Sequence, residues 1–130
     1  MREIKFRGRD KRYDGTWEPW MYGSLDLSDL WPAIIENGPP LSVQRETVGQ
    51  YIGLKDDNGV EIYEGDVVSC STFRGVVMYN QYTASFQAVS AGWWPISLEY
   101  DKHDPFEVIG NVFDNPEFDK QFGEVYRKEQ

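Results

Sequence analysis

Three groups of residues are candidates for metal binding or catalysis. The acidic turn 56–66 contains several carboxylates and Gly59, a composition similar to that of an EF-hand calcium loop. If Gly59 takes the sixth position of such a loop, Leu54 falls at the first position and Gly65 at the twelfth. Both of these positions need a carboxylate. We therefore interpret the turn as a solvated hairpin tip without calcium.

The single histidine and the single cysteine define the other two groups. His103 lies near Asp101 and Asp104, but adjacent side chains of an extended loop point apart, so a transition metal would need ligands from elsewhere. Cys70 could act as a nucleophile only with His103 as its base, and nothing in their spacing brings the two together. The apolar run before Cys70 favours a small buried residue.

Motifs for nucleotide binding and for serine hydrolysis are absent from the sequence. Neither GxGxxG nor GxxxxGK followed by Ser or Thr occurs, and there is no Gly-x-Ser-x-Gly elbow. Asp and Glu total 22 residues, but their abundance alone identifies no acid–base pair. We therefore predict a protein that is not an enzyme, with no catalytic residue, cofactor or metal. A small enzyme whose catalytic carboxylates are scattered along the sequence is kept as a further hypothesis, after the two binding hypotheses given below.

The tryptophans suggest binding more than catalysis. Trp93 and Trp94 would point to opposite faces of an extended segment, which would leave at least one of them exposed. Trp17 and Trp20 form a second concentration together with Trp31. Because tryptophan is frequent in interface hot spots, Trp17, Trp20, Trp93 and Trp94 are candidate residues of a protein–protein surface. Packing in the core and at sheet edges is the alternative.

Charge is unevenly distributed along the chain. Residues 1–13 contain six basic and two acidic residues, +4, whereas the whole chain has a net charge of -9. The acidic remainder repels a phosphate backbone and argues against general nucleic-acid binding. Stacking on single-stranded bases would need basic residues beside the aromatic ones, and residues 93–107 contain a single Lys or Arg, Lys102. The basic segment could pair with the acidic body of its own or a neighbouring subunit, remain solvated, or contact phosphate locally. We predict that Arg7 and Arg9 contact another subunit.

Length and composition predict one globular domain. The 130 residues are 40% hydrophobic and 15% aromatic, enough material for a core. No apolar run approaches the ~18 residues of a membrane span, and the charged start MREIKFRGRD does not resemble a signal peptide. A single cysteine excludes an internal disulfide. We therefore expect a cytoplasmic protein with no membrane association.

Short segments of alternating apolar residues, separated by turn signals, predict strands. In residues 3–9 the alternation places Ile4, Phe6 and Gly8 on a buried side, and Arg7 and Arg9 on the solvent side. A helical turn is expected at 24–31 and a helix at 116–128, with Asn115 as its N-cap. Turns are expected at 14–15, 37–40, 57–59 and 64–66, and further strands at 17–22, 33–36, 47–52, 60–63, 67–71, 76–79, 85–89, 93–98 and 107–112.

This arrangement predicts a mainly β fold within a single domain, 1–130. Residues 65–68 and 75–77 resemble the first strands of SH3-like barrels, which places a barrel-like part at 46–112. Residues 1–45 would supply additional N-terminal strands and a loop, and residues 115–128 a short C-terminal helix.

Three stretches of the sequence resemble the YopX family, small proteins typical of bacteriophages and prophages. They are REIKFRGRD (2–10), ETVGQYIGLKDDNGVEIYEGDVV (46–68) and EVIGNVFDNPEF (107–118), in the family's order. Ile52 departs from the threonine expected there, and residues 24–45 and 80–105 match no family motif. The resemblance implies a mainly β fold with a barrel-like part, a phage or prophage origin and self-association. It implies no biochemical activity.

Read physically, the central stretch is a set of turns. Asp56, Asn58 and Asp66 are turn-forming residues whose side chains can bond nearby amides, so we interpret the motif as mainly structural, with a binding surface as the alternative. The favoured hypothesis is a non-catalytic module that forms a homo-oligomer and binds a host or phage protein. The alternative is nucleic-acid binding, or an acidic surface that mimics DNA.

Overall fold

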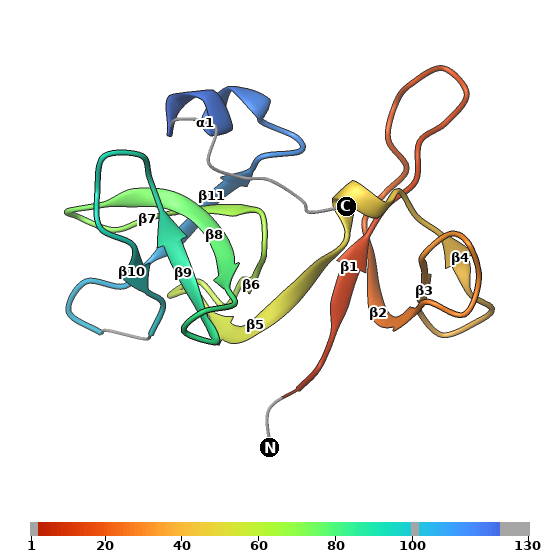
Figure 1. Cartoon of the computed structure of the whole chain (residues 1–130), viewed down its shortest axis with the longest axis horizontal. Helices are drawn as coiled ribbons and strands as arrows, with labels where there is room; N and C mark the ends of the chain where they lie inside the picture. Colours follow the sequence, from red (N-terminus) through yellow and green to blue (C-terminus); the bar gives the residue numbers. More distant parts are fainter. Residues whose placement is uncertain (1–2, 100–101, 123–130) are drawn as a thin grey trace. The chain divides into compact units, whose positions relative to one another are not determined.

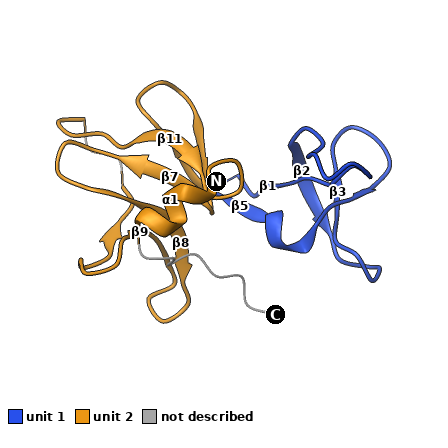
Figure 2. Cartoon of the chain, turned by 90° about the horizontal axis from the view of Figure 1, so that it is seen from above, with its two compact units in different colours: residues 1–51 blue, residues 52–130 orange. Residues whose placement is uncertain are grey.

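The computed structural model describes residues 3–99 and 102–122, and its strands form two antiparallel sheets. The chain divides into two compact units, residues 1–51 (unit 1) and 52–130 (unit 2), coloured separately in Figure 2. The division falls inside one strand, whereas the sequence placed the start of the barrel-like part at residue 46. Unit 1 contains β1 (Phe6–Gly8), β2 (Met21–Asp26), β3 (Ala33–Ile35), β4 (Leu41–Ser42), the 3-10 helix η1 (Arg45–Thr47) and the first part of β5 (Gly49–Lys55).

Unit 1 is a small curled sheet in the order β4-β3-β2-β1-β5. The chain after β4 returns to the end of β1, where the Gln44 N–H donates to the Arg9 carbonyl at 2.9 Å. The Thr47 hydroxyl accepts the Arg9 N–H at 3.1 Å and donates to the Gln44 carbonyl at 2.7 Å. Val43, 1% exposed, packs on Gly8, where a Cβ would lie only 3.0 Å from a Val43 methyl. Because residue 8 is glycine, the Val43 side chain can pack directly against the backbone of β1.

Unit 2 is built around a second sheet, in the order β10-β9-β8-β7-β11, with a short helix beside it (Figure 1). Its elements are the rest of β5, β6 (Glu61–Tyr63), β7 (Asp66–Ser69), β8 (Arg74–Asn80), β9 (Ser85–Val89), β10 (Ile96–Ser97), β11 (Glu107–Asn111) and α1 (Pro116–Gln121).

Consecutive valines of β7 and β8 supply the two faces of this sheet. Val67 belongs to a cluster with Phe118 and Phe122, which cover one face from α1 and its end. Val68 belongs to a second cluster with Ile52 and Ile62, which cover the other face from β5 and β6. Successive strand residues point to opposite faces, so neighbouring apolar residues serve two cores. Both valines are 0% exposed.

The predicted fold class is confirmed in part. The mainly β class is confirmed, but within residues 3–99 and 102–122 no strand pairing closes a barrel. β5 and β6 place Ile52 and Ile62 against a face of the second sheet, and the sheet order ends at β10 and β11. In its described part, the segment expected to form the barrel therefore consists of strands packed in layers, and the second sheet keeps two open edges, β10 and β11.

Two local predictions are also corrected. The helical turn expected at 24–31 is wrong, because Ser24 to Asp26 belong to β2 and pair with β3. The short C-terminal helix begins at Pro116 as predicted, but the Asn115 side chain makes no capping hydrogen bond. The Asn115 side chain instead lies next to Gly110, where a Cβ on residue 110 would come within 2.6 Å of the Asn115 Oδ1. The rest of the predicted helix, 123–128, lies outside the described residues.

Candidate interaction surfaces

Arg7, Arg9, Trp17 and Trp20 come together in one stack within unit 1. The Arg7 guanidinium lies 4.5 Å from the centre of the Trp20 ring, and that of Arg9 lies 4.3 Å from the same ring. Arg9 also lies 4.5 Å from the Trp17 ring, which the Lys11 ammonium approaches at 5.0 Å. We call these five residues the cation–aromatic stack. Such pairs are stabilised by attraction between the cation and the ring face.

The stack buries the side of residues 3–9 that the sequence predicted to face solvent. Arg7 and Arg9 are each 5% exposed, whereas Ile4, placed on the buried side by alternation, is 65% exposed. The side-chain period of the strand is intact, but its polar side faces two indoles that cover the arginine stems and guanidinium groups. The prediction that these arginines face solvent is therefore wrong. Their role in contacting a second subunit stays a prediction, which must take account of this burial.

Trp93 and Trp94 lie in a different environment, on the connection from β9 to β10. The Trp93 side chain is 69% exposed and that of Trp94 is 89% exposed. Ile96 of β10, two residues after Trp94, is 37% exposed, and β10 is an end strand of the second sheet. We call Trp93, Trp94 and Ile96 the tryptophan surface. Both indoles are available to a partner, whereas Trp17 and Trp20 are partly buried in the stack.

A groove in unit 1 was not anticipated from the sequence. It holds about 480 Å³ and lies between the segment that enters β2 and the end strand β4. Its residues come from three separate parts of unit 1, so no local sequence signal could have found it. Its lining consists of Asp10, Glu18, Pro19, Trp20, Met21, Leu41 and Ser42.

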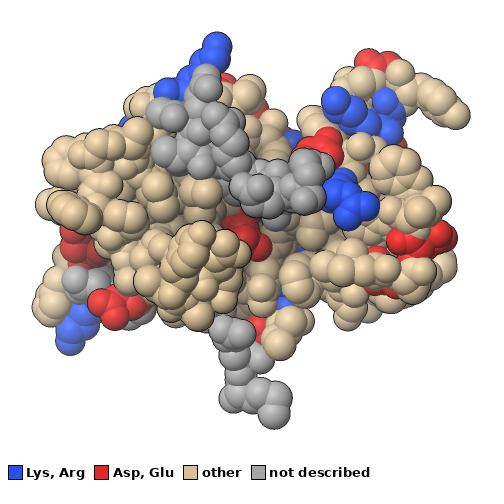
Figure 3. Space-filling model, in the orientation of Figure 1, with Lys and Arg blue, Asp and Glu red and all other residues tan. Residues whose placement is uncertain are grey.

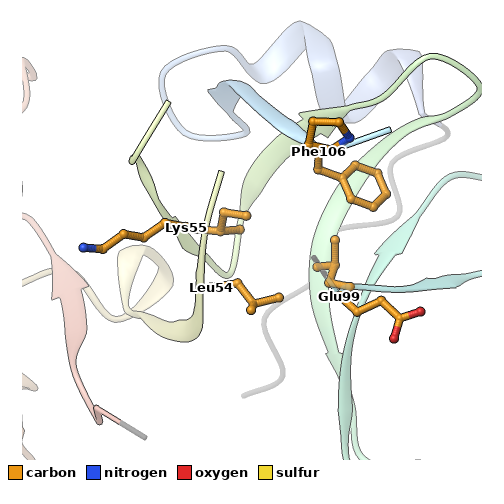
Figure 4. Close-up of a pocket in the computed structure, with 7 residues that line it drawn as sticks. Leu54, Lys55, Glu99 and Phe106 are labelled. Carbon is orange, nitrogen blue, oxygen red and sulfur yellow. The ribbon is translucent and has the colours of Figure 1, made fainter. Parts of the chain in front are cut away.

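Unit 2 contains a much smaller crevice (Figure 4). It holds about 10 Å³, room for roughly one water molecule. Leu54 and Phe106 lie along it, while the charged ends of Lys55 and Glu99 point away from each other. The crevice therefore offers no convergent acid and base, and it is too small for an organic ligand.

The residues considered for metal binding and catalysis are dispersed. Among the residues that the structure describes, no three His, Cys, Asp or Glu side chains form a group able to hold a metal ion. Asp101 lies outside the described residues, and Asp104 binds Ser71 rather than a histidine. Cys70 is half-buried and packs against the core of unit 2, and its sulfur lies 3.7 Å from the Thr72 hydroxyl.

The Asp104 carboxylate fastens the loop before β11 to the end of β7. It accepts the Ser71 N–H and the Ser71 hydroxyl, both at 2.9 Å, and these bonds, the backbone bond most, hold its pKa below the ordinary 3.8. A lowered pKa means that this contribution to stability is complete above about pH 3.8 and is lost as the pH falls through the lower folded-state pKa.

We predict that the Asp104 carboxyl carbon, followed by NMR against pH, titrates below 3.8. Ser71→Ala should move this midpoint part of the way back toward 3.8, because it removes the hydroxyl bond and leaves the backbone bond. An unchanged midpoint in Ser71→Ala would show that the hydroxyl does not bind the carboxylate in solution.

In the described part of the chain no helix is long and apolar enough to cross a membrane. The architecture and the surfaces together define a mainly β protein of two compact units that exposes aromatic surface.

The chain belongs to the YopX family. The model of this family, described as YopX protein, matches residues 5–118, which confirms the resemblance. No curated protein matches the sequence. Membership supplies the family and leaves the biochemical function unknown.

Proposed function

We propose that this protein is a non-catalytic, phage- or prophage-derived interaction module that self-associates through the tryptophan surface. The observation that carries the proposal is the exposure of two adjacent indoles, 69% for Trp93 and 89% for Trp94. Tryptophan loses little conformational entropy on binding for the area it buries, and it is enriched at interface hot spots.

The position of these indoles favours a protein as partner. They lie beside β10, whose two residues are both exposed at the end of a sheet. An end strand presents backbone donors and acceptors on its outer side and can pair with another strand. Two copies could therefore pair their β10 strands antiparallel, which would bring the indoles of both copies into one isologous interface.

The charge distribution favours this hypothesis over direct nucleic-acid binding. On the face seen in Figure 3, Lys and Arg side chains occur in separate small groups with Asp, Glu and uncharged residues between them. A phosphate backbone is bound by a continuous basic surface. The net charge of -9 further opposes the approach of a polyanion.

Sedimentation equilibrium over a range of protein concentrations tests the proposal. Trp93→Ala and Trp94→Ala, alone and together, are compared with Trp31→Ala, which removes a 61% exposed indole elsewhere in the chain. Each substitution in the tryptophan surface should weaken self-association by about 30-fold, equivalent to a hot spot of ~2 kcal/mol. A wild-type protein that stays monomeric, or an equal loss in Trp31→Ala, would contradict self-association through this surface.

A further inference from the structure

We propose that the groove of unit 1 binds an extended peptide segment of a partner protein, one that carries apolar and basic side chains and adds to the edge of β4. The groove lies in unit 1 and uses none of the tryptophan surface, so this inference goes beyond the proposed function. The groove holds about 480 Å³, within the range of volumes found for small-molecule sites and thus enough for a few side chains.

Part of the groove lining is apolar, and we call its residues Trp20, Met21 and Leu41 the floor. Trp20 lines the groove, and two guanidinium groups of the cation–aromatic stack lie 4.3 and 4.5 Å from its ring centre. Met21 and Leu41 line the groove from β2 and β4, and Leu41 remains 54% exposed. An aromatic ring that is already fixed loses little entropy when a ligand packs on it. The floor thus suits the apolar side chains of a peptide.

One side of the groove is a strand edge. β4 pairs with β3 through Leu41 and Ser42, and it is the last strand of its sheet. An extended peptide can add to such an edge through main-chain hydrogen bonds, while alternate side chains enter the adjacent pocket. The position of Leu41 and Ser42 in the lining places this edge against the groove.

The charged side chains that line the groove favour a basic peptide. The lining contains two carboxylates, Asp10 and Glu18, and no cation. Asp10 accepts hydrogen bonds from the Lys11 backbone N–H at 2.8 Å and the Gln44 side-chain amide at 2.7 Å, both neutral donors. Glu18 forms an ion pair of 3.2 Å with Arg12, which is 45% exposed and so open to exchange with an incoming cation.

The lining charges also oppose a phosphate-containing occupant. The two lining carboxylates would repel the phosphate groups of a nucleic-acid strand or a phosphopeptide. The occupant that fits both the apolar floor and the acidic rim is therefore a peptide with alternating apolar and basic residues.

Two pools of synthetic extended peptides test this inference, one with alternating leucine and lysine positions and the other with glutamate in place of lysine. Binding to the full-length protein is measured by fluorescence anisotropy and mapped by NMR. Glu18→Lys is the test variant, and Glu46→Lys is its matched control, because Glu46 is an exposed carboxylate of unit 1 outside the groove. Leu41→Asp tests the apolar floor, with Leu27→Asp, 65% exposed, as its control.

The lysine pool should bind saturably, the glutamate pool should not, and the shifts should fall on residues 18–21 and on Leu41 and Ser42. Glu18→Lys should weaken binding about tenfold and Glu46→Lys by less than about twofold. No saturable binding of the lysine pool, equal effects of the two charge reversals, or equal binding of the glutamate pool would overturn the inference. Groove resonances that shift with protein concentration alone would also overturn it, in favour of a second copy as the occupant.

Discussion

Replacing Asp56 with alanine is expected to lower the free energy of unfolding by about 4 kcal/mol. The carboxylate is 7% exposed and accepts three backbone N–H groups: those of Asn58 and Val60, each at 2.9 Å, and that of Val108 at 3.1 Å. It thereby joins the turn between β5 and β6 to β11, across 52 residues of sequence. Alanine would leave these donors without their acceptor, at a cost of roughly 1–3 kcal/mol for each buried group.

Chemical denaturation of Asp56→Ala, Asp56→Asn and Asp57→Ala measures this effect. Asp56→Asn should cost about half as much as alanine, because its amide keeps one oxygen for Asn58 and Val60 and loses the acceptor for Val108. Asp57→Ala, an exposed neighbour in the same turn, should change stability by less than about 0.5 kcal/mol. Equal losses in Asp56→Ala and Asp57→Ala would contradict the structural role of Asp56.

The second large effect is expected at Arg9. Arg9→Met keeps most of the apolar stem and removes the guanidinium that lies between Trp17 and Trp20. We expect a loss of about 3 kcal/mol, since a desolvated cation over an indole contributes ~2 kcal/mol or more and two rings are involved. Thermal and chemical unfolding, followed by tryptophan fluorescence, measure it.

Two other substitutions provide reference values for the loss of unfolding free energy expected in Arg9→Met. Lys11→Met removes the exposed cation at the end of the stack and should cost only about 0.5–1 kcal/mol. Arg45→Met removes an exposed guanidinium outside the stack and should cost no more than Lys11→Met. If Arg9→Met is as stable as Arg45→Met, the stack does not stabilise the fold.

The burial of Arg9 also changes how subunit contact must be tested. Reversing the charge of Arg7 and Arg9 together would place two carboxylates against the indoles and is expected to unfold unit 1. A change in mass after that reversal would then report unfolding and say nothing specific about an interface. Substitutions at the exposed Trp93 and Trp94 avoid this difficulty.

Turn chemistry explains most of what could be predicted from the sequence. The turn at Asp57-Asn58-Gly59 is confirmed, with a φ of 82° at Gly59, as is the turn at Gly65, with a φ of 90°. The strand 85–89 is confirmed with the same bounds, and the strand expected at 107–112 ends one residue earlier, at Asn111. Local backbone preferences act over a few residues, so a single sequence contains enough information to predict them.

The faces of β1 and the groove depend on contacts between distant residues. Alternation correctly separated Arg7 and Arg9 from Ile4, but it could not show that Trp17 and Trp20 cover the arginine side. Hydropathy assigns a charged residue to solvent, whereas an indole face can replace part of that solvent. Similarly, the groove exists only because residues 41–42 and 18–21 come together in the folded unit.

The central claim is that the tryptophans have two roles, with Trp17 and Trp20 in the fold and Trp93 and Trp94 in self-association. Fluorine NMR of the protein labelled with 5-fluorotryptophan, with signals assigned by single Trp→Phe variants, tests this claim directly. As the protein concentration rises, the signals of Trp93 and Trp94 should shift or broaden together, and those of Trp17 and Trp20 should stay fixed. Fixed signals at Trp93 and Trp94, or shifts confined to Trp17 and Trp20, would contradict the claim.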